Sequence, residues 1–307
     1  MGIARNLLLW GSRNRWLENQ MRKRAFSRRA VRRFMPGEEA SNALAAAAAQ
    51  PERIGAILTQ LGENIDNAAA AAAVRDHYEG VLDQIAAQHL RAEISVKLTQ
   101  LGLDLDQQTC SDHVTALAAH AGPHGSRVWI DIEDSSYVDV TLQTFRRVRE
   151  RHENVGLCLQ SYLYRTVDDL EALLPLNPAI RLVKGAYNEP AAVAFPKKQD
   201  VDRNYLEIGT RLIAHAANGG TPPVFGTHDM RLATALQQRA GEHGLAKAAC
   251  EIHMLYGIGT ADQRQLAAEG YGVRVLISYG SAWFPWYMRR LAERPANVWF
   301  VVKSVFR

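Results

Sequence analysis

The chain has 307 residues, of which 47% are hydrophobic and 22% are charged. This length is enough to bury a full hydrophobic core, and single α/β barrels commonly have this size. No apolar run is long enough to cross a bilayer. The three cysteines are scattered and lack CxxC spacing, which argues against a disulfide framework and a structural zinc site and predicts a reducing compartment.

Positive charge is concentrated at the N-terminus. Residues 1–33 hold ten Arg and Lys against one acid, whereas the rest of the chain holds 26 bases and 31 acids. Leucine, tryptophan and phenylalanine are interleaved with these bases. Such a basic amphipathic segment can lie on an anionic membrane surface, bind nucleic acid, or simply cap the protein as a solvated helix. We expect residues 1–50 to form an N-terminal helical arm and residues 51–307 to form one barrel domain.

After an alanine-rich helix predicted over 38–49, strand-like and helical patterns alternate. Apolar, strand-like runs cover 54–61, 92–98, 127–132, 155–160, 180–185, 223–228, 250–255 and 273–278. Helical patterns cover about 67–89, 112–120, 138–151, 166–173, 201–217, 230–242, 260–269 and 282–293. Strict alternation predicts a parallel α/β barrel of the (β/α)₈ type. Expected helix starts are Ser111, Asp139, Thr166, Asp229 and Thr260.

Polar residues assigned to the ends of these strands are the candidates for a functional site, because chemistry in such barrels lies at the carboxyl ends of the strands. They are Glu63, Lys97, Asp131, Gln160, Lys184, Thr227, His228 and Arg274. A charge in an apolar strand is expensive to bury alone, so several at similar positions indicate a shared polar pocket. His253 has no nearby His or Cys partner, so we expect no metal. No G-x-G-x-x-G, Walker loop or G-x-S-x-G is present.

The last predicted helix carries two adjacent arginines beside aromatic residues. Trp286 lies three and four positions before Arg289 and Arg290, and Glu293 follows them at the same spacings. One helix face therefore presents an aromatic ring, two guanidinium groups and a carboxylate. Paired guanidinium groups suit a small carboxylate ligand. A solvated surface helix with an intrahelical ion pair is the alternative at this point.

Seven segments in chain order resemble the proline dehydrogenase family, in its monofunctional bacterial form. They read LTQLGE (58–63), ISVK (94–97), WIDIE (129–133), RLVKGAY (181–187), FGTH (225–228), EIHMLYG (251–257) and MRRLAE (288–293). The most specific are RLVKGAY and the helix with the arginine pair. The resemblance runs from about residue 54 to the end. It implies a distorted barrel whose last helix sits over the barrel mouth, with FAD as the cofactor.

The resemblance also implies roles for individual residues. Arg289 and Arg290 would bind the substrate carboxylate, assisted by Lys97, and Glu63 matches the acid that can pair with Arg289. Other residues implied to line the substrate pocket are Asp131, Tyr187, Leu255, Leu276 and Trp286. Arg181 falls beside the flavin N5. The further positions implied to contact the cofactor are Asp131, Gln160, Val183, Lys184, Gly185, Ala186, Lys198, Thr227, His228, Leu255 and Glu293.

The implied reaction is FAD-dependent oxidation of L-proline to 1-pyrroline-5-carboxylate by hydride transfer to flavin N5. This is the first step of proline degradation to glutamate, and the electrons pass to a membrane quinone. The basic N-terminal arm fits such an acceptor. We therefore expect a cytoplasmic protein with peripheral contact to the inner face of the cell membrane, and no nucleic-acid partner.

Three positions depart from the family pattern. Leu276 and Trp286 stand where the family usually has tyrosines that pack against the proline ring, and His253 replaces a common glutamine. Because these changes alter the wall of the pocket, a substituted proline or another cyclic secondary amino acid is an alternative substrate. More remote alternatives are a Schiff-base lyase that uses Lys184 and a non-catalytic binder that has kept FAD.

Overall fold

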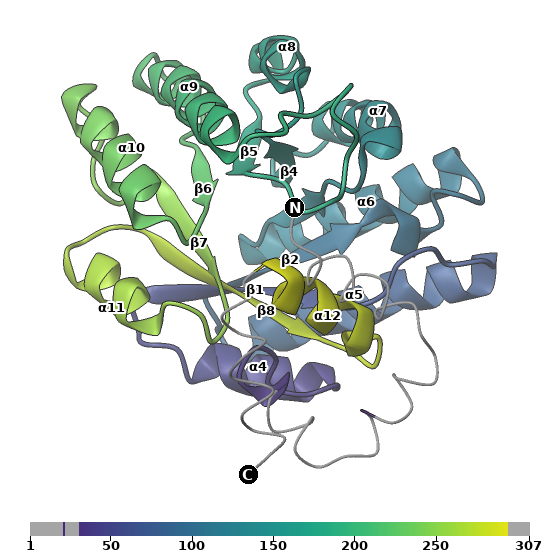
Figure 1. The fold of residues 1–307 in the computed structure, drawn as a ribbon. Coiled ribbons are helices and arrows are strands. Elements are labelled where there is room, and N and C mark those ends of the chain that lie inside the picture. Colours follow the sequence, from purple (N-terminus) through teal and green to yellow (C-terminus); the bar gives the residue numbers. More distant parts are fainter. Residues whose placement is uncertain (1–20, 22–30, 294–307) are drawn as a thin grey trace.

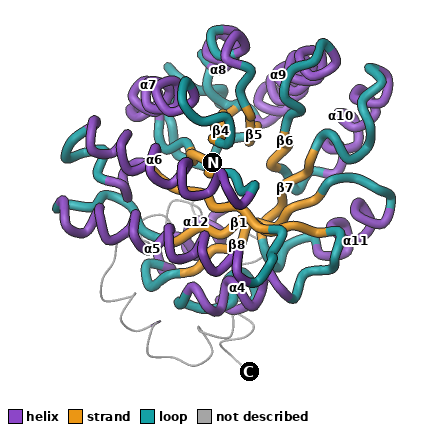
Figure 2. The backbone as a smooth tube through the Cα atoms, turned by 180° about the vertical axis from the view of Figure 1, so that it is seen from behind, coloured by secondary structure: helices purple, strands orange, loops and turns teal. Residues whose placement is uncertain are grey.

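The computed structural model describes residue 21 and residues 31–293, without the side chains of residues 289–293. Its strands are β1 (Ile54–Gln60), β2 (Ala92–Lys97), β3 (Val128–Asp131), β4 (Val155–Gln160), β5 (Ala179–Val183), β6 (Val224–Gly226), β7 (Glu251–Leu255) and β8 (Val273–Tyr279). They pair in parallel in sequence order, and β8 pairs with β1 to close the barrel. The predicted (β/α)₈ barrel is confirmed, and Figures 1 and 2 show helices arranged around these strands.

The helices follow the predicted pattern with shifted ends. They are α4 (Ala40–Ala48), α5 (Ala68–Ala87), α6 (Gln107–Ala121), α7 (Val138–Arg149), α8 (Thr166–Glu171), α9 (Lys198–Ala217), α10 (Met230–Glu242), α11 (Thr260–Ala268) and α12 (Trp283–Glu293). The predicted start at Ser111 is wrong. The Asp106 carboxylate caps α6 instead, accepting a 2.6 Å hydrogen bond from the Thr109 backbone N–H. Asp229 is confirmed as the N-cap residue directly before α10.

The hydrophobic core has two layers because both faces of a parallel barrel are covered. Outward-facing strand residues such as Ile94 and Ile130 pack against the helices and are fully buried. That cluster includes Ala43 and Leu44 of α4, so this helix of the predicted N-terminal arm packs on the barrel. The inner layer is a smaller cluster, which consists of Ile57, Trp129, Ala179 and Val224.

Helix α12 is held by residues that precede the barrel in the sequence. Val31 and Met35 form a buried cluster with aromatic residues of α12, among them Phe284 and Tyr287. The indole N–H of Trp283 also donates a 2.9 Å hydrogen bond to Glu38. Helix α12 follows the carboxyl end of β8 and projects onto β8 and β1 in Figure 1. Among residues 31–293, no helix combines the length and apolar character that a membrane span requires.

Arg274 lies at the opposite end of the barrel from the place predicted for it. It is the second residue of β8, so its side chain enters the barrel at the amino ends of the strands. There it forms ion pairs with Glu93 (3.2 Å) and Glu251 (2.9 Å). The prediction failed because the side chain was assigned by its strand and not by its position along that strand. Arg274 therefore neutralises buried acids and does not belong to the site at the carboxyl ends.

His253, the residue that replaces a family glutamine, is buried in the barrel interior. Its Nε2 lies 3.1 Å from Glu251 Oε2, and its Nδ1 has no hydrogen-bond partner in the described part of the chain. A second proton would therefore have no acceptor. Burial lowers the pKa of His253 to about 4, and this outweighs the opposing effect of Glu251. His253 is thus neutral at physiological pH and packs edge-on against Trp129.

This histidine makes the stability of the protein sensitive to mild acid. Between the ordinary imidazole pKa and about 4, the unfolded chain takes up a proton that folded His253 does not, so stability falls as pH falls. When the pH is lowered from 7 to 5, we expect the free energy of unfolding to fall by about 2 kcal/mol more in the parent protein than in His253→Gln. Urea unfolding at both pH values measures this difference. Equal pH dependence in the two proteins would contradict the assignment of a buried neutral His253.

Candidate active site

Arg181 is the centre of a polar cluster at the carboxyl half of the barrel. It lies in β5, is 4% exposed, and forms an ion pair with Asp131 at the end of β3. Its Nη2 also donates to Ser95 Oγ (2.7 Å), and its Nε donates to Cys158 Sγ (2.7 Å). Burial raises the pKa of Cys158 to about 12, so the sulfur is a neutral thiol. The Asp131 carboxylate is therefore the formal negative charge directly paired with Arg181.

Trp129 forms the floor under this arginine. The Arg181 guanidinium carbon lies 4.9 Å from the centre of the Trp129 ring, a cation–π contact. The indole N–H donates a 2.6 Å hydrogen bond to Glu93, which fixes the plane of the ring. Burial alone would lower the pKa of Arg181, but the hydrogen bond to Cys158 and the charge of Asp131 outweigh burial and raise that pKa above its ordinary value. Arg181 is thus a fixed, fully charged group.

A second ion pair lies on the neighbouring strand end. Lys97, the last residue of β2, places its Nζ 2.8 Å from Glu63 Oε2, in the loop after β1. Both side chains are partly exposed, at 17% and 25%, so they can reach a ligand from one side. Ser95 and Lys97 lie two residues apart and therefore point to the same face of the strand. The Glu63–Lys97 and Asp131–Arg181 pairs are consequently neighbours on the inner face of the barrel.

The loop after β5 has no space for a side chain at Gly185. Gly185 has a φ of +112°, and a Cβ there would lie 2.4 Å from the Tyr162 ring. The same loop is tied to the 3₁₀ helix η3 (Ser135–Tyr137), which follows β3, because Glu189 accepts hydrogen bonds from the Ser135 backbone N–H (2.7 Å) and hydroxyl (2.6 Å). The chain from Lys184 to Glu189 thus forms a fixed backbone edge beside the carboxyl end of β5.

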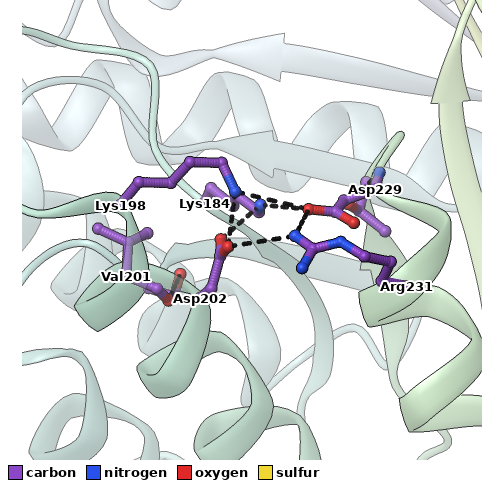
Figure 3. A network of polar contacts seen from close by, with 8 residues as sticks. Lys184, Lys198, Val201, Asp202, Asp229 and Arg231 are labelled. Carbon is purple, nitrogen blue, oxygen red and sulfur yellow. Dashed lines mark hydrogen bonds and ion pairs between the residues drawn. The ribbon is translucent and has the colours of Figure 1, made fainter.

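Five charged residues gather where α9 and α10 begin (Figure 3). Lys184 Nζ lies 2.6 Å from Asp202 and 3.2 Å from Asp229. Lys198 contacts the same two acids at 2.6 and 3.6 Å, and Arg231 does so at 3.7 and 3.0 Å. Three bases against two acids leave an excess positive charge. Helix N-termini also attract anions, so this cluster suits a phosphate group.

The acids in this cluster stay ionised. Burial alone would raise the pKa of Asp229, but hydrogen bonds from Arg231 and Lys184 lower it to about 2. The Asp202 pKa is also lowered, because Lys184 and Lys198 outweigh its burial. Lys184 is consequently held between two carboxylates, at 2.6 Å from Asp202 and 3.2 Å from Asp229. An ε-amino group engaged in two ion pairs is not free to attack a carbonyl, which argues against the predicted alternative of a Schiff base at Lys184.

Other predicted cofactor contacts line the strand ends beside these clusters. Gln160 ends β4 and donates through Nε2 to the Glu133 carbonyl (3.2 Å). His228 Nε2 accepts a 3.0 Å hydrogen bond from the Leu255 backbone N–H at the end of β7. Thr227 Oγ1 accepts from the Asp229 backbone N–H at 3.0 Å. Val183 ends β5, and Ala186 is exposed in the loop beyond it.

The residues implied to contact the substrate ring are placed less uniformly. Leu276 is half-buried in the barrel and packs against the inner cluster that includes Trp129. Trp286 packs against the buried cluster between α12 and Val31. Tyr187 is half-buried in the loop after β5. Arg289, Arg290 and Glu293 lie on α12, but their side chains are outside the described part of the structure, so their roles remain predictions.

Sequence reasoning missed several partners of the predicted residues. Around Arg181 it missed Ser95, Cys158 and the floor role of Trp129. The alternation of side chains between the two faces of a strand could have indicated them, because each lies two residues before a predicted site residue on the same strand. Asp202 and Arg231 of the charge cluster were missed as well. They follow helix starts and carried no signal that would bring them to Lys184.

The residues present fit a flavin nucleotide on two observations. Arg181 Nη1 and Gln160 Oε1 are buried and have no hydrogen-bond partner within the described residues, so both can bind the polar edge of a ring. The positive cluster of Lys184, Lys198 and Arg231 lies where Lys184 follows the carboxyl end of β5, the strand that carries Arg181, and this cluster can hold phosphates.

A closed parallel barrel whose charged residues converge at the carboxyl ends defines the class of (β/α)₈-barrel proteins with a polar site in the barrel mouth. The family model described as proline dehydrogenase matches residues 43–303. The chain therefore belongs to the proline dehydrogenase family.

Named relatives agree with this assignment, and a solved structure shares the fold. The chain is 36% identical to proline dehydrogenase 2 of Bacillus subtilis (strain 168), covering 99% of both chains. It is 39% identical to proline dehydrogenase of Deinococcus radiodurans, covering 90% of this chain and 89% of that one. Its fold is similar to proline utilization A of Bdellovibrio bacteriovorus, with a TM-score of 0.81 at 20% identity. This match covers 94% of the present chain but only 36% of the longer chain.

Proposed function

We propose that the protein oxidises L-proline to 1-pyrroline-5-carboxylate with FAD as cofactor and a quinone as electron acceptor. The single observation that carries this proposal is the buried cluster of Arg181, Asp131 and Ser95, next to the Lys97–Glu63 pair, inside a barrel of this family. FAD, when bound, supplies the acceptor for the hydride that leaves the ring carbon beside nitrogen.

The side chains divide the work of binding and orientation. Lys97, pre-positioned by Glu63, contributes a positive charge for the substrate carboxylate, together with Arg289 and Arg290 by resemblance. Fixing the carboxylate fixes the ring, which is a positioning effect. Arg181 stabilises negative charge that develops near it, because Asp131 and Trp129 already hold it in place. The ring nitrogen must be unprotonated before hydride leaves, so turnover rises with pH toward the alkaline side.

A substituted proline is the second candidate substrate. Leu276, which replaces the tyrosine that the resemblance implies, leaves an apolar wall beside the inner cluster. The test is reduction of a soluble quinone analogue with L-proline and with trans-4-hydroxy-L-proline, using Leu276→Tyr as the matched variant. We expect L-proline to have the higher kcat/KM in the parent protein. Faster turnover of hydroxyproline would favour the second candidate, and no turnover of any ring amino acid would contradict the proposal.

The N-terminal arm is proposed to bring the protein to the inner face of the cell membrane, where the quinone lies. Residues 1–33 hold ten bases and one acid, and this positive charge supports contact with an anionic membrane surface. Deletion should stop at residue 30, because Val31 and Met35 pack against α12. The full chain should sediment with anionic vesicles and the truncated chain should not. Equal sedimentation of both would overturn the membrane role.

A further inference from the structure

Two histidines and an aspartate converge on the outside of the barrel, remote in the fold from the clusters at the carboxyl ends. Asp83 lies on α5, His120 lies in the last turn of α6, and His124 ends the short 3₁₀ helix η2 (Gly122–His124). One ligating atom from each residue lies within 4.8 Å of the other two. We propose that these three residues form a binding site for a divalent transition-metal ion of the zinc type.

The donor set determines the class of ion. Two imidazoles and one carboxylate suit Zn²⁺, Co²⁺, Ni²⁺ or Cu²⁺, whereas Mg²⁺ and Ca²⁺ prefer oxygen ligands. Three protein ligands leave one position of a tetrahedral ion for water. His120 is also in the last turn of α6, where the helix dipole favours a positive charge.

The local structure brings the ligands together before any ion binds. His120 Nε2 already lies 2.7 Å from Asp83 Oδ1, and the ring of His124 has its centre 6.2 Å from that of His120. Gly125, with a φ of +63°, ends η2 and turns the chain back toward β3, which fixes the position of His124. A metal ion would replace the proton that now joins His120 to Asp83, and small side-chain rotations would bring all three ligands to bonding distance.

The site has both access and a structural consequence. His120 and Asp83 are 32% and 61% exposed at their side chains, so an ion can enter from solvent. His124 also lines a cavity of about 540 Å³ at the amino end of the barrel, beside His89 and Arg91. Because Asp83 and the two histidines come from different helices, a bound ion would link α5 to the end of α6.

In the experiment, the full, metal-free chain is titrated with Zn²⁺ alone, and binding is measured by calorimetry. We expect one Zn²⁺ per chain, no competition by Mg²⁺ and a Zn²⁺-dependent rise in Tm. Loss of a group that only hydrogen-bonds to a metal ligand commonly lowers metal affinity 10- to 100-fold. Loss of a direct ligand should cost at least as much, so His120→Ala, His124→Ala and Asp83→Asn should each weaken binding by at least about tenfold.

His243→Ala is the control, because His243 is an exposed histidine after α10. It should bind Zn²⁺ as the parent does. Absence of Zn²⁺ binding by the parent would overturn the proposal, and so would site variants that bind as tightly as the parent. An equal loss in His243→Ala would likewise overturn it, since it would indicate nonspecific surface binding.

Discussion

Arg181→Met is expected to lower kcat/KM for L-proline by about 10²- to 10³-fold, the loss typical of removing one fixed group that stabilises developing charge. Arg181 is 4% exposed and already oriented by Asp131, Ser95 and Cys158, so its charge needs no rearrangement during the reaction. Arg181 is proposed to lie beside the flavin, so removing its positive charge should also make the reduction potential of the bound FAD more negative. Steady-state kinetics and spectroelectrochemistry measure the two effects.

Two variants make this result specific to Arg181. Arg181→Lys keeps the charge but loses the planar fork that reaches Asp131, Ser95 and Cys158 together, so it should fall between the parent and Arg181→Met. Arg147→Met removes an exposed arginine on α7 and should leave kcat/KM and the reduction potential unchanged. An Arg181→Met protein that binds FAD and keeps kcat/KM and potential near those of the parent would show that Arg181 has no part in the reaction.

Asp131→Ala is expected to lower the free energy of unfolding by about 3 kcal/mol, because it leaves Arg181 buried without its negative partner. This value is at the low end for a broken buried pair, since the Asp131 side chain is 21% exposed and solvent screens part of the interaction. Asp131→Asn keeps a hydrogen-bond acceptor and should cost less. Urea unfolding of the variants measures the difference.

A double-mutant cycle isolates the pair from other effects of the substitution. In an Arg181→Met background there is no buried charge left to strand, so Asp131→Ala should cost much less there than in the parent. The same loss in both backgrounds would mean that Asp131 stabilises the protein by some route other than its ion pair with Arg181.

The barrel could be predicted from the sequence because its signal is local and repeated. Runs such as 155–160 are bounded and rich in β-branched or apolar residues, and β4 spans the same residues in the structure. Position along a strand was harder to predict. Arg274 was assigned to the carboxyl ends, although as the second residue of β8 it lies at the amino ends with Glu93 and Glu251.

The sequence could name candidate site residues one at a time, but it could not indicate contacts between residues from distant segments. Asp131 and Arg181 were both predicted, but nothing in the sequence indicated that they pair, since they lie on β3 and β5. The Lys184 cluster joins three segments, from the loop after β5, from α9 and from the start of α10 (Figure 3). Such contacts depend on how the strands are staggered around the barrel, which pattern and propensity do not encode.

We propose that this barrel binds FAD and uses it to oxidise proline. The most direct measurement is the visible spectrum of the purified protein under anaerobic conditions, before and after addition of L-proline. We predict a yellow protein whose main flavin band is bleached by L-proline. A protein that carries FAD but is bleached by neither L-proline nor any other cyclic secondary amino acid would contradict the claim.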